Sequence, residues 1–366
     1  MNTLKIAIFI SDFYAGGVSR MMVNLSNGIA SKGHTMDLLI CFRDAPFFEN
    51  INSSVNVIQL DKSACMATQV SEYLANSEPR VLMTAMVRDH LTAQTAKSQL
   101  GHCNTKLYAR SGTNYFEEIR TTTFLKRAKQ RKLICKAYQN TDEVIAVSKG
   151  VADGLNKLCN IPLNKIHTPK NPTVTPYIQE QASQTISHPW FEEKEPVIVS
   201  VGGLNKRKNF ELLIDAFAAV NQTHPCKLMI LGNGKRLARL QARAEKLNII
   251  DRIAFLGFIE NPYPYMKQAA MTILSSNREG SPNVLAESLS LHTPLVSTDC
   301  PSGPREILDG GKYGVLVPMK DVKAMTAGII KVLGTQWPAT LFDEAVEPYL
   351  LKNSVRDYLT AFGFVN

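Results

Sequence analysis

The sequence predicts an α/β protein of two domains, each with a parallel sheet that is covered by helices on both faces. Short apolar segments alternate with amphipathic segments of helix length, and one proline-rich stretch interrupts the alternation. Such alternation favours parallel strands, because the crossover between two parallel strands usually contains a helix. The length of 366 residues also suits two domains of roughly 150 residues each.

The first domain is predicted over residues 1–170. It opens with "LKIAIFI", a continuous apolar run that is typical of a strand buried on both faces. An amphipathic helix, "VSRMMVNLSNGIASKG", follows, and further strands are predicted at "MDLLICF", "VNVIQL", "VLMTAM", "KLYARS" and "EVIAVS". The periodicity then fails across a proline-rich segment, which predicts an interdomain linker over residues 171–195.

The second domain is predicted over residues 196–340, where the alternation resumes. Its strands are predicted at "VIVSVGGL", "KLMILG", "IAFLGF", "MTILSS" and "PLVST", and its helices at "FELLIDAFAAV", "RLARLQARAEKLN" and "PNVLAESLSL". The last segment, residues 341–366, is expected to contain a C-terminal helix that packs back on the first domain.

Composition and charge narrow the class of protein. Hydrophobic residues make up 45% and charged residues 20%, as in globular proteins, and the net charge of +9 favours nucleic acid, anionic lipid or phosphorylated metabolites as partners. The seven cysteines show no CxxC pair and no metal-ligand spacing, so we expect mostly free thiols and no metal. Free thiols indicate a reducing compartment, so we expect a cytoplasmic location. Because no apolar run is long enough to cross a bilayer, we expect neither a signal peptide nor a membrane span.

Two glycine-containing loops follow predicted strands. Gly16 and Gly17 precede the first helix, where they would let a ligand approach the backbone and the helix N-terminus, although a tight turn that needs positive φ explains them equally well. "GNGKRL", which begins at Gly232, resembles the start of a dinucleotide fingerprint, but Leu237 replaces its third glycine. Nicotinamide binding is therefore only weakly supported.

A third loop, "GGLNKRKN" over residues 202–209, contains three adjacent cations. Lys206, Arg207 and Lys208 follow a buried strand, and ligands of open α/β sheets bind beyond the carboxyl ends of the strands. Three cations at that edge suit a diphosphate, and a solvated loop is the alternative.

The segment "NREGSPNVLAES" places two acids eight residues apart. Ser281 and Pro282 suit an N-cap and a first helical position, so Glu279 is predicted in the preceding loop, while Asn283 and Glu287 share one helix face. This arrangement predicts an anion-binding helix start with two carboxylates that can accept hydrogen bonds from hydroxyls. Glu287 could instead face solvent, but in so apolar a helix a partly buried acid needs a partner.

Together these motifs resemble the retaining glycosyltransferases of family 4. The E-x7-E pattern of Glu279 and Glu287 is preceded, in the family's order, by "AVSKGV", "VGGLNKRKN", "ILGNG" and "FLGF". The resemblance runs over nearly the whole chain and implies the GT-B fold, in which two Rossmann-like domains face each other across a cleft. The first domain would bind the acceptor and the second the nucleotide sugar.

The resemblance also implies roles for individual residues. Lys208 would bind the donor diphosphate, Glu279 would hold the donor sugar, and Glu287 would bind the ribose; Lys208 and Glu279 are the expected catalytic residues. The expected donor-binding residues are Gly16, Gly17, Gly203, Arg207, Lys208, Gly232, Ile259, Glu279, Gly280, Ser281, Pro282, Asn283, Val284 and Glu287.

Two positions depart from the family pattern. Gly203 stands where an arginine is usual, so that Lys206 or Arg207 is left to supply the charge. Arg110 and its neighbours Ser111 and Gly112 stand where many members have a histidine, which leaves the catalytic helper of the first domain unassigned.

A basic segment in the first domain suggests the acceptor. Between residues 106 and 136 there are nine Lys/Arg and two acids, and the segment reads as a basic helix that would meet anionic lipid or the pyrophosphate of a lipid-linked glycan. A solvated helix face is the alternative. The residues expected to contact acceptor or membrane are Arg120, Lys126, Arg127, Lys129, Arg131 and Lys132.

The predicted function is a retaining, metal-independent glycosyltransferase without a cofactor, peripheral on the inner face of the plasma membrane. It would transfer a hexose or N-acetylhexosamine from a nucleoside diphosphate sugar, with UDP favoured, to a lipid-linked or polysaccharide acceptor in cell-surface glycan synthesis. A UDP-sugar 2-epimerase of the GT-B fold is one alternative. A non-catalytic protein that docks on membrane or nucleic acid is another, although the sequence carries no RNA-binding aromatic signature and nucleic acid is not expected as a partner.

Overall fold

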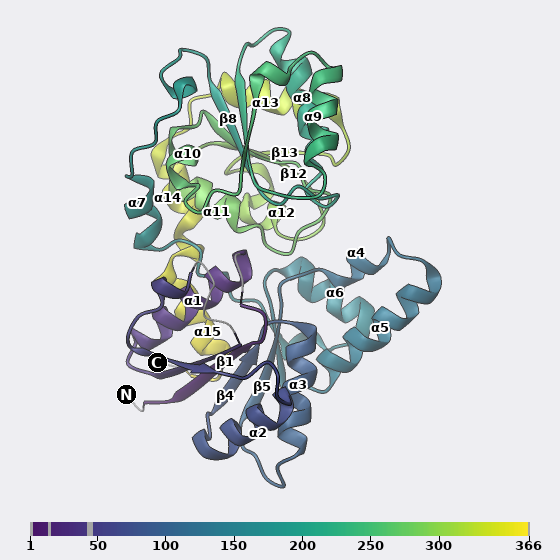
Figure 1. Ribbon diagram of the computed structural model, residues 1–366, viewed down its shortest axis with the longest axis vertical. Helices are drawn as coiled ribbons and strands as arrows, with labels where there is room; N and C mark the ends of the chain where they lie inside the picture. The colour runs from purple at the N-terminus through teal and green to yellow at the C-terminus, as the bar shows by residue number, and fades with distance from the viewer. Residues whose placement is uncertain (1–2, 14–15, 42–46, 365–366) are drawn as a thin grey trace. The chain divides into compact units, whose positions relative to one another are not determined.

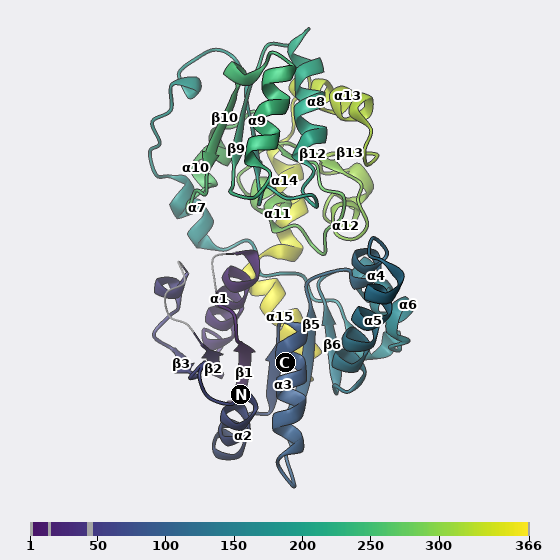
Figure 2. The same cartoon turned by 45° about the vertical axis from the view of Figure 1, so that its right-hand side comes forward.

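The structure is a computed structural model that describes residues 3–13, 16–41 and 47–364 (Figures 1 and 2). It divides the chain into two compact units. Unit 1 comprises Met1–Thr173 and Tyr349–Asn366, and unit 2 comprises Val174–Pro348. The backbone therefore passes from one unit to the other twice.

Unit 1 contains a seven-stranded parallel sheet in the order β3-β2-β1-β4-β5-β6-β7, which confirms the predicted parallel α/β architecture. Its strands are β1 (Lys5–Ile10), β2 (Thr35–Ile40), β3 (Val55–Gln59), β4 (Val81–Thr84), β5 (Lys106–Ser111), β6 (Glu143–Ala146) and β7 (Ile166–His167). Its helices are α1 (Gly17–Ala30), α2 (Met66–Ser77), α3 (Val87–Ser98), α4 (Tyr115–Ile119), α5 (Phe124–Gln139), α6 (Lys149–Cys159) and α15 (Leu351–Ala361).

Strand β1 explains why both faces of this sheet are covered. Ile6 and Ile8 point into a core that includes residues of α1 and α15, whereas Ala7 and Phe9 point into a second core with residues of α2 and α3. Successive strand residues face opposite sides, so a strand that is apolar at every position requires helices on both faces.

The C-terminal helix α15 packs on α1 within unit 1, as Figure 1 shows. The contact is close because Gly28 of α1 has no side chain: a Cβ there would lie 2.4 Å from Val355 and 2.8 Å from Leu351. The preceding helix α14 (Ala339–Val346) belongs to unit 2 and packs on α11 (Asn283–Ser290). Of the predicted C-terminal segment 341–366, only the part from Tyr349 onward therefore lies in unit 1.

Unit 2 repeats the design with a six-stranded parallel sheet in the order β10-β9-β8-β11-β12-β13. Its strands are β8 (Val197–Val201), β9 (Lys227–Leu231), β10 (Ile253–Gly257), β11 (Met271–Leu274), β12 (Leu295–Thr298) and β13 (Val315–Val317). Besides α11 and α14, its helices are α7 (Pro176–Ala182), α8 (Phe210–Asn221), α9 (Leu237–Lys246), α10 (Tyr263–Gln268), α12 (Pro304–Ile307) and α13 (Val322–Leu333).

Several elements were not predicted from the sequence. The proline-rich segment 171–195 contains helix α7, which starts with a proline and packs on α10. Strands β7 and β13 were not predicted because strands of two and three residues are too short to show an apolar pattern. The remaining short turns are 3-10 helices at Phe48–Asn50, Leu163–Lys165, Pro189–Phe191, Ile250–Arg252, Asp309–Gly311 and Glu347–Tyr349.

Candidate functional site

The strand order of unit 2 reverses between β8 and β11, which lie side by side at the centre of the sheet. Chain connections leave these two strands in opposite directions, so their following loops diverge and leave room for a ligand at the carboxyl edge. The loop after β8 contains Arg207 and Lys208, and the loop after β11 contains Glu279. The sheet topology thus brings together residues that are 71 positions apart in the chain.

Lys208 and Glu279 form the centre of this site. The ammonium of Lys208 lies 2.7 Å from Glu279 Oε1, and their side chains are only 13% and 6% exposed. Ser276 donates a second hydrogen bond to Oε1 at 2.7 Å, and Arg207 Nη1 lies 3.9 Å from Oε2. The cluster of two cations and one carboxylate therefore keeps a net positive charge at the end of β8.

The electrostatic balance keeps Glu279 ionised. Burial alone would raise the pKa of Glu279, but the charges of Lys208 and Arg207 and the hydrogen bonds from Lys208 and Ser276 outweigh it, so the pKa lies below its ordinary value. Cys300 lies next to this carboxylate, and burial, reinforced by the charge of Glu279, raises the pKa of its thiol to about 12. Glu279 can accept hydrogen bonds at neutral pH but holds no proton to donate.

The two loops are also joined through their backbones. Asn277 donates from its backbone N–H to the carbonyl of Arg207 at 2.7 Å, and Ser275 donates from its hydroxyl to the carbonyl of Lys208 at 2.8 Å. Within the first loop, Asn205 Oδ1 accepts hydrogen bonds from the N–H groups of Arg207 and Lys208. These contacts fix the loop, so the cations are held in place before any ligand arrives.

Gly232 has a packing role in the structure. It has a φ of 155°, and a Cβ there would lie 2.0 Å from the carbonyl oxygen of Gly202, so the loops after β8 and β9 can approach only without a side chain. Gly203 is tolerant by comparison, because its Cβ would meet Asn205 Nδ2 at 3.2 Å and Asn233 O at 3.8 Å.

Helix α11 begins one residue later than predicted. Pro282, predicted as the first helical residue, occupies the N-cap position with an extended ψ of 101°, and Ser281, predicted as the N-cap, lies outside the helix. The start of α11 packs against the loop after β12, where Gly303 has a φ of 88° and a Cβ would lie 2.6 Å from Pro282. This close packing, rather than a side-chain cap, fixes where the helix begins.

Glu287, at the fifth position of α11, is partly buried and has a partner that the sequence did not reveal. The hydroxyl of Tyr263, a residue with 1% exposure at the start of α10, lies 3.5 Å from Glu287 Oε1. Ile259 and Val284 pack against the same apolar cluster as Tyr263. Tyr177 and Tyr265 pack against the same cluster, so the sequence alone could not single out Tyr263 as the partner.

Unit 1 has its own reversal of strand order, between β1 and β4. Gly16 follows β1 and has a φ of 172°, which is extended backbone, and a Cβ there would contact none of the described residues within 4 Å. A turn that needs positive φ therefore does not explain Gly16, and packing against the described residues does not require a glycine there. Gly17 is the first residue of α1; Ala15, which precedes the pair, lies outside the described residues.

The same edge of unit 1 holds a buried acid. Asp89, at the start of α3, is 0% exposed and accepts hydrogen bonds from the hydroxyl and N–H of Ser11. Arg88 contacts the Ser11 hydroxyl and Asp12, each at 2.7 Å. Burial raises the pKa of Asp89 to about 6.

Arg110, at the end of β5, is 3% exposed and has only neutral partners among the described residues. It donates to the hydroxyl of Tyr358 at 3.2 Å and to Asn171 Oδ1 at 2.9 Å. Tyr358 belongs to α15, and Asn171 lies just before the chain enters unit 2. Arg110 therefore joins β5 to both of the segments by which the chain enters and leaves unit 1.

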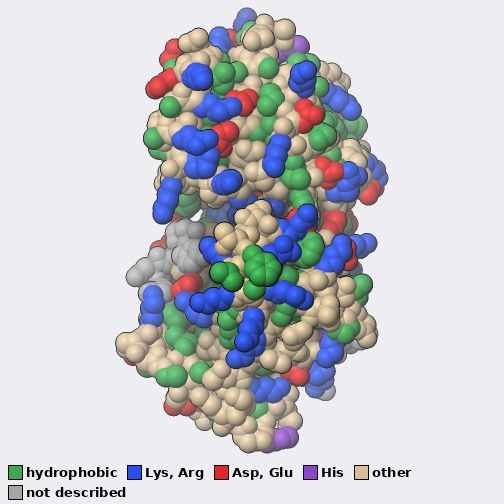
Figure 3. All heavy atoms as spheres, turned by 90° about the vertical axis from the view of Figure 1, so that its right-hand side faces the viewer, with side chains coloured by type: hydrophobic (Ala, Val, Ile, Leu, Met, Phe, Trp, Pro, Cys, Tyr) green, Lys and Arg blue, Asp and Glu red, His purple; other side chains and the backbone are tan. Residues whose placement is uncertain are grey.

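Helix α5 presents a basic surface, as predicted. Six cations and no acid lie between Phe124 and Gln139, and none of them forms an ion pair with a carboxylate of the described residues. Phe124 and Leu125 are 82% and 81% exposed, and Figure 3 shows hydrophobic side chains among Lys and Arg on this face. Arg120, outside the helix, pairs with Glu117 at 3.0 Å. Within the described ranges we find no helix with the length and hydropathy of a membrane span.

Two family models match this chain. Residues 15–173 match "Glycosyltransferase Family 4", and residues 183–344 match "Glycosyl transferases group 1". The curated N-acetylgalactosamine-N,N'-diacetylbacillosaminyl-diphospho-undecaprenol 4-alpha-N-acetylgalactosaminyltransferase of Campylobacter jejuni is 34% identical over 201 residues, which cover 55% of this chain and 53% of that relative. The chain thus spans about half the length of this relative.

Solved structures show the same fold over nearly the whole chain. The HepE protein of Anabaena, solved in complex with UDP and glucose, matches with a TM-score of 0.78 over 99% of this chain and 100% of its own, at 14% identity. The lipopolysaccharide outer core galactosyltransferase WaaB in its apo form matches with a TM-score of 0.74 over 98% and 99%, at 20% identity. These similarities, together with the two parallel sheets, show the GT-B fold that the sequence predicted.

Proposed function

We propose that this chain, which belongs to the glycosyltransferases of the GT-B fold, transfers a hexose or N-acetylhexosamine from a UDP-linked donor to a lipid-linked or polysaccharide acceptor. The observation that carries the proposal is the buried pair of Lys208 and Glu279, with the more exposed Arg207 beside it, at the reversal of strand order in unit 2. The cations of this site can bind a diphosphate, and its ionised carboxylate can accept hydrogen bonds from sugar hydroxyls. The named relatives that act on lipid-linked and lipopolysaccharide acceptors support the class of acceptor.

Charge develops on the diphosphate when the bond to the sugar breaks. Lys208 would stabilise that charge, because a fixed cation in a water-poor site needs no reorganisation during the reaction, and the more exposed Arg207 would add to its effect. Lys208 already pairs with Glu279, so the donor would share this ammonium with the carboxylate rather than meet a free charge. We propose that these side chains, without a metal ion, suffice for departure of the diphosphate, and that full activity in the presence of a chelator tests this part.

Glu279 would position the sugar rather than exchange protons with it. Its pKa lies below the ordinary value, so it is a carboxylate at neutral pH and can accept hydrogen bonds from sugar hydroxyls. We propose that the acceptor attacks on the face from which the diphosphate departs, and hence that the anomeric configuration is retained. Product stereochemistry, read from the anomeric proton coupling, tests retention directly.

The other predicted donor residues would bind the ribose, the base and the phosphates of the nucleotide sugar. Glu287, oriented by Tyr263, would bind the ribose hydroxyls, and Ile259 would border the base. The open backbone at Gly16 and the start of α1 at Gly17 would admit the phosphates, since a helix N-terminus attracts anions. Gly203, Gly232, Gly280, Ser281, Pro282, Asn283 and Val284 would shape the loops around the donor.

The acceptor surface would be formed by α5 and the end of α4. Its cations would attract anionic headgroups and the diphosphate of a lipid carrier. Those that form no ion pair with a described carboxylate are Lys126, Arg127, Lys129, Arg131 and Lys132, and Arg120 lies just before α5. Exposed Phe124 and Leu125 would enter the headgroup region. We therefore propose that the protein binds peripherally to the inner face of the plasma membrane.

Incubation with a panel of nucleotide sugars, with and without membrane lipid extract as acceptor, tests the function. Nucleoside diphosphate release that requires both donor and acceptor is expected. Conversion of the donor into its C2 epimer without acceptor would point to an epimerase instead. Binding to lipid vesicles with no turnover of any nucleotide sugar would contradict the enzyme assignment.

A further inference from the structure

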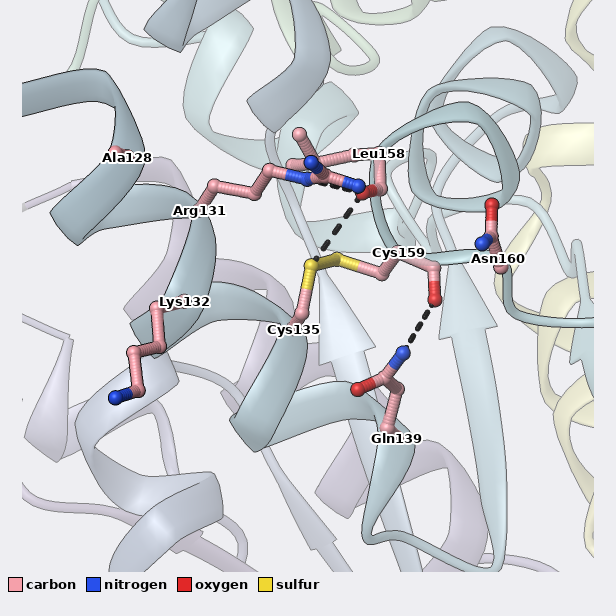
Figure 4. Close-up of a pocket in the computed structure, with 8 residues that line it drawn as sticks. All are labelled: Ala128, Arg131, Lys132, Cys135, Gln139, Leu158, Cys159 and Asn160. Carbon is pink, nitrogen blue, oxygen red and sulfur yellow. Dashed lines mark hydrogen bonds between the residues drawn. A yellow bond between two sulfur atoms is a disulfide. The ribbon is translucent and has the colours of Figure 1, made fainter. Parts of the chain in front are cut away.

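Helices α5 and α6 are joined by a disulfide between Cys135 and Cys159, which are 24 residues apart (Figure 4). The sequence predicted mostly free thiols, and Cys41, Cys65, Cys103, Cys226 and Cys300 are indeed free. The two cysteines meet because α5 packs against α6, which brings the C-terminal half of α5 to the end of α6.

A pocket of about 320 Å³ lies against this disulfide. Its lining contains the cations Arg131 and Lys132, the amides of Gln139 and Asn160, both cysteines and no acid. Arg131 Nε donates to the carbonyl of Leu158 at 3.0 Å, which holds the guanidinium beside the sulfur atoms (Figure 4). Neither cation forms an ion pair with a carboxylate in the described part of the chain.

We propose that Cys135–Cys159 is a reversible thiol–disulfide exchange site for small thiols that carry a carboxylate. The pocket gives the anionic group cations and amide donors, and it places the incoming sulfur next to the disulfide. Cys135 is half-buried whereas Cys159 is 2% exposed, so the geometry favours attack at Cys135 Sγ.

The exchange balances in two steps. A small thiolate attacks Cys135 Sγ, a mixed disulfide forms there, and Cys159 leaves as a thiolate that takes a proton from water. A second small thiolate then attacks the outer sulfur of the mixed disulfide, which releases an oxidised small disulfide and leaves Cys135 as a thiolate that is protonated in turn. The protein gains two electrons and two protons, and two small thiols are oxidised to one disulfide.

The site can close again because the helices do not depend on the disulfide for contact. Gln139 donates to the carbonyl of Cys159 at 2.6 Å, and the Arg131 bond to Leu158 lies beside it. Ile134 and Tyr138 of α5 are buried in a core that also includes residues of α6. After reduction the two thiols would therefore stay close together, as reversible exchange requires.

The experiment compares 3-mercaptopropionate, which is anionic, with cysteamine, which is cationic and similar in size. Cys65→Ser protein is used, because Cys65 is an exposed thiol that would also react. Mixed disulfides are quantified by mass spectrometry after acid quenching, and each rate is divided by the rate of the same thiol with bis(2-hydroxyethyl) disulfide. This division removes differences in thiolate content and nucleophilicity.

We expect the normalised rate to favour mercaptopropionate by at least about fivefold at low salt, since nearby unscreened cations attract it. Arg131→Gln/Lys132→Gln should abolish this preference, and Lys132→Gln alone, which leaves the Arg131 bond to Leu158 in place, should reduce it. Lys157→Gln is the matched control, because Lys157 is exposed on α6 but does not line the pocket. The adduct should be found on Cys135.

Three results would overturn the proposal. The two thiols could react at equal normalised rates, the preference could persist in the double variant, or the adduct could be found on Cys159. The outcome is independent of the glycosyltransferase assignment, because no nucleotide sugar or acceptor takes part in the assay.

Discussion

The ammonium of Lys208 lies 2.7 Å from Glu279 Oε1, and this pair joins the two loops that meet at the centre of the unit 2 sheet. Neither side chain is more than 13% exposed. Removal of one partner from a buried ion pair leaves the other charge uncompensated, which commonly costs about 3–5 kcal/mol. Any test of this pair must therefore separate catalysis from stability.

Lys208→Ala should lower the rate of nucleoside diphosphate release on the order of 100-fold, because one stabilising contact to developing charge is lost. It should also lower the unfolding midpoint, which Lys208→Ala/Glu279→Gln should partly restore without restoring activity. Lys246→Ala, an exposed lysine on α9, is the control for loss of a cation. If the double variant recovers wild-type turnover, Lys208 has a structural role only.

Gly16→Ala and Gly232→Ala should affect different properties of the protein: the first should weaken UDP binding, and the second should lower stability. A Cβ at Gly16 would meet none of the described residues and its φ is extended, so Gly16→Ala should leave the melting temperature unchanged but weaken UDP binding. A Cβ at Gly232 would collide with the Gly202 carbonyl, so Gly232→Ala should destabilise the protein by about 2–4 kcal/mol. Thermal unfolding measures the stability of each variant, and titration with UDP measures its affinity. Equal UDP affinity in wild type and Gly16→Ala would show that Gly16 is not part of the donor site.

Glu287→Gln should raise the KM for the nucleotide sugar roughly tenfold, as expected when a charged hydrogen-bond acceptor for the ribose is weakened. Removal of the ribose 2′-hydroxyl from the donor should weaken binding to wild type more than binding to Glu287→Gln, because the substitution and the deoxygenation remove the same contact. Tyr263→Phe, which removes the hydroxyl beside Glu287, should have a smaller effect. Additive losses would show that Glu287 does not bind the ribose hydroxyl.

The stability of unit 1 should fall as pH rises from about 4 to about 6. Burial raises the pKa of Asp89 from 3.8 to about 6, so the folded state binds more protons than the unfolded state within this window. Above pH 6, ionisation of Asp89 then lowers the free energy of unfolding by about 3 kcal/mol. Glu279 acts in the opposite direction: its pKa is lowered, so its contribution to stability is present above pH 4.5 and is lost as pH falls below it.

Asp89→Asn should therefore flatten the profile between pH 4 and 6, whereas Glu279→Gln should flatten it below pH 4.5. Urea unfolding at a series of pH values gives both curves. Parallel curves for wild type and Asp89→Asn would show that Asp89 titrates normally in the folded protein.

The basic helix α5 should bind vesicles that contain anionic lipid. Lys126→Glu/Lys129→Glu should weaken this binding by about 1 kcal/mol or more per residue, and added salt should weaken wild-type binding in the same way. Phe124→Ser should weaken it even at high salt, because its contribution is apolar. Lys323→Glu/Lys331→Glu, two exposed lysines of α13 in unit 2, is the charge-matched control, and an equal loss with that variant would place the membrane contact elsewhere.

The sequence by itself determined the class of fold and the chemistry of the loops. Apolar runs such as that of β1 and helical periodicity such as that of α1 are local properties, and they required parallel sheets with helices on both faces. Loop composition likewise located cations near Lys208 and acids near Glu279. These signals can be read because they depend on residues close in the chain.

The tertiary structure decided which of these residues meet. Adjacent β8 and β11 bring Lys208 to Glu279 across 71 positions, α10 supplies Tyr263 to Glu287, and the packing of α5 on α6 pairs two cysteines. Local sequence could not show these partners, because strand order and helix packing are set by burial of the whole core. The start of α11 differed for the same reason: Gly303 permits close packing against Pro282, a constraint imposed by a loop some twenty residues further along the chain.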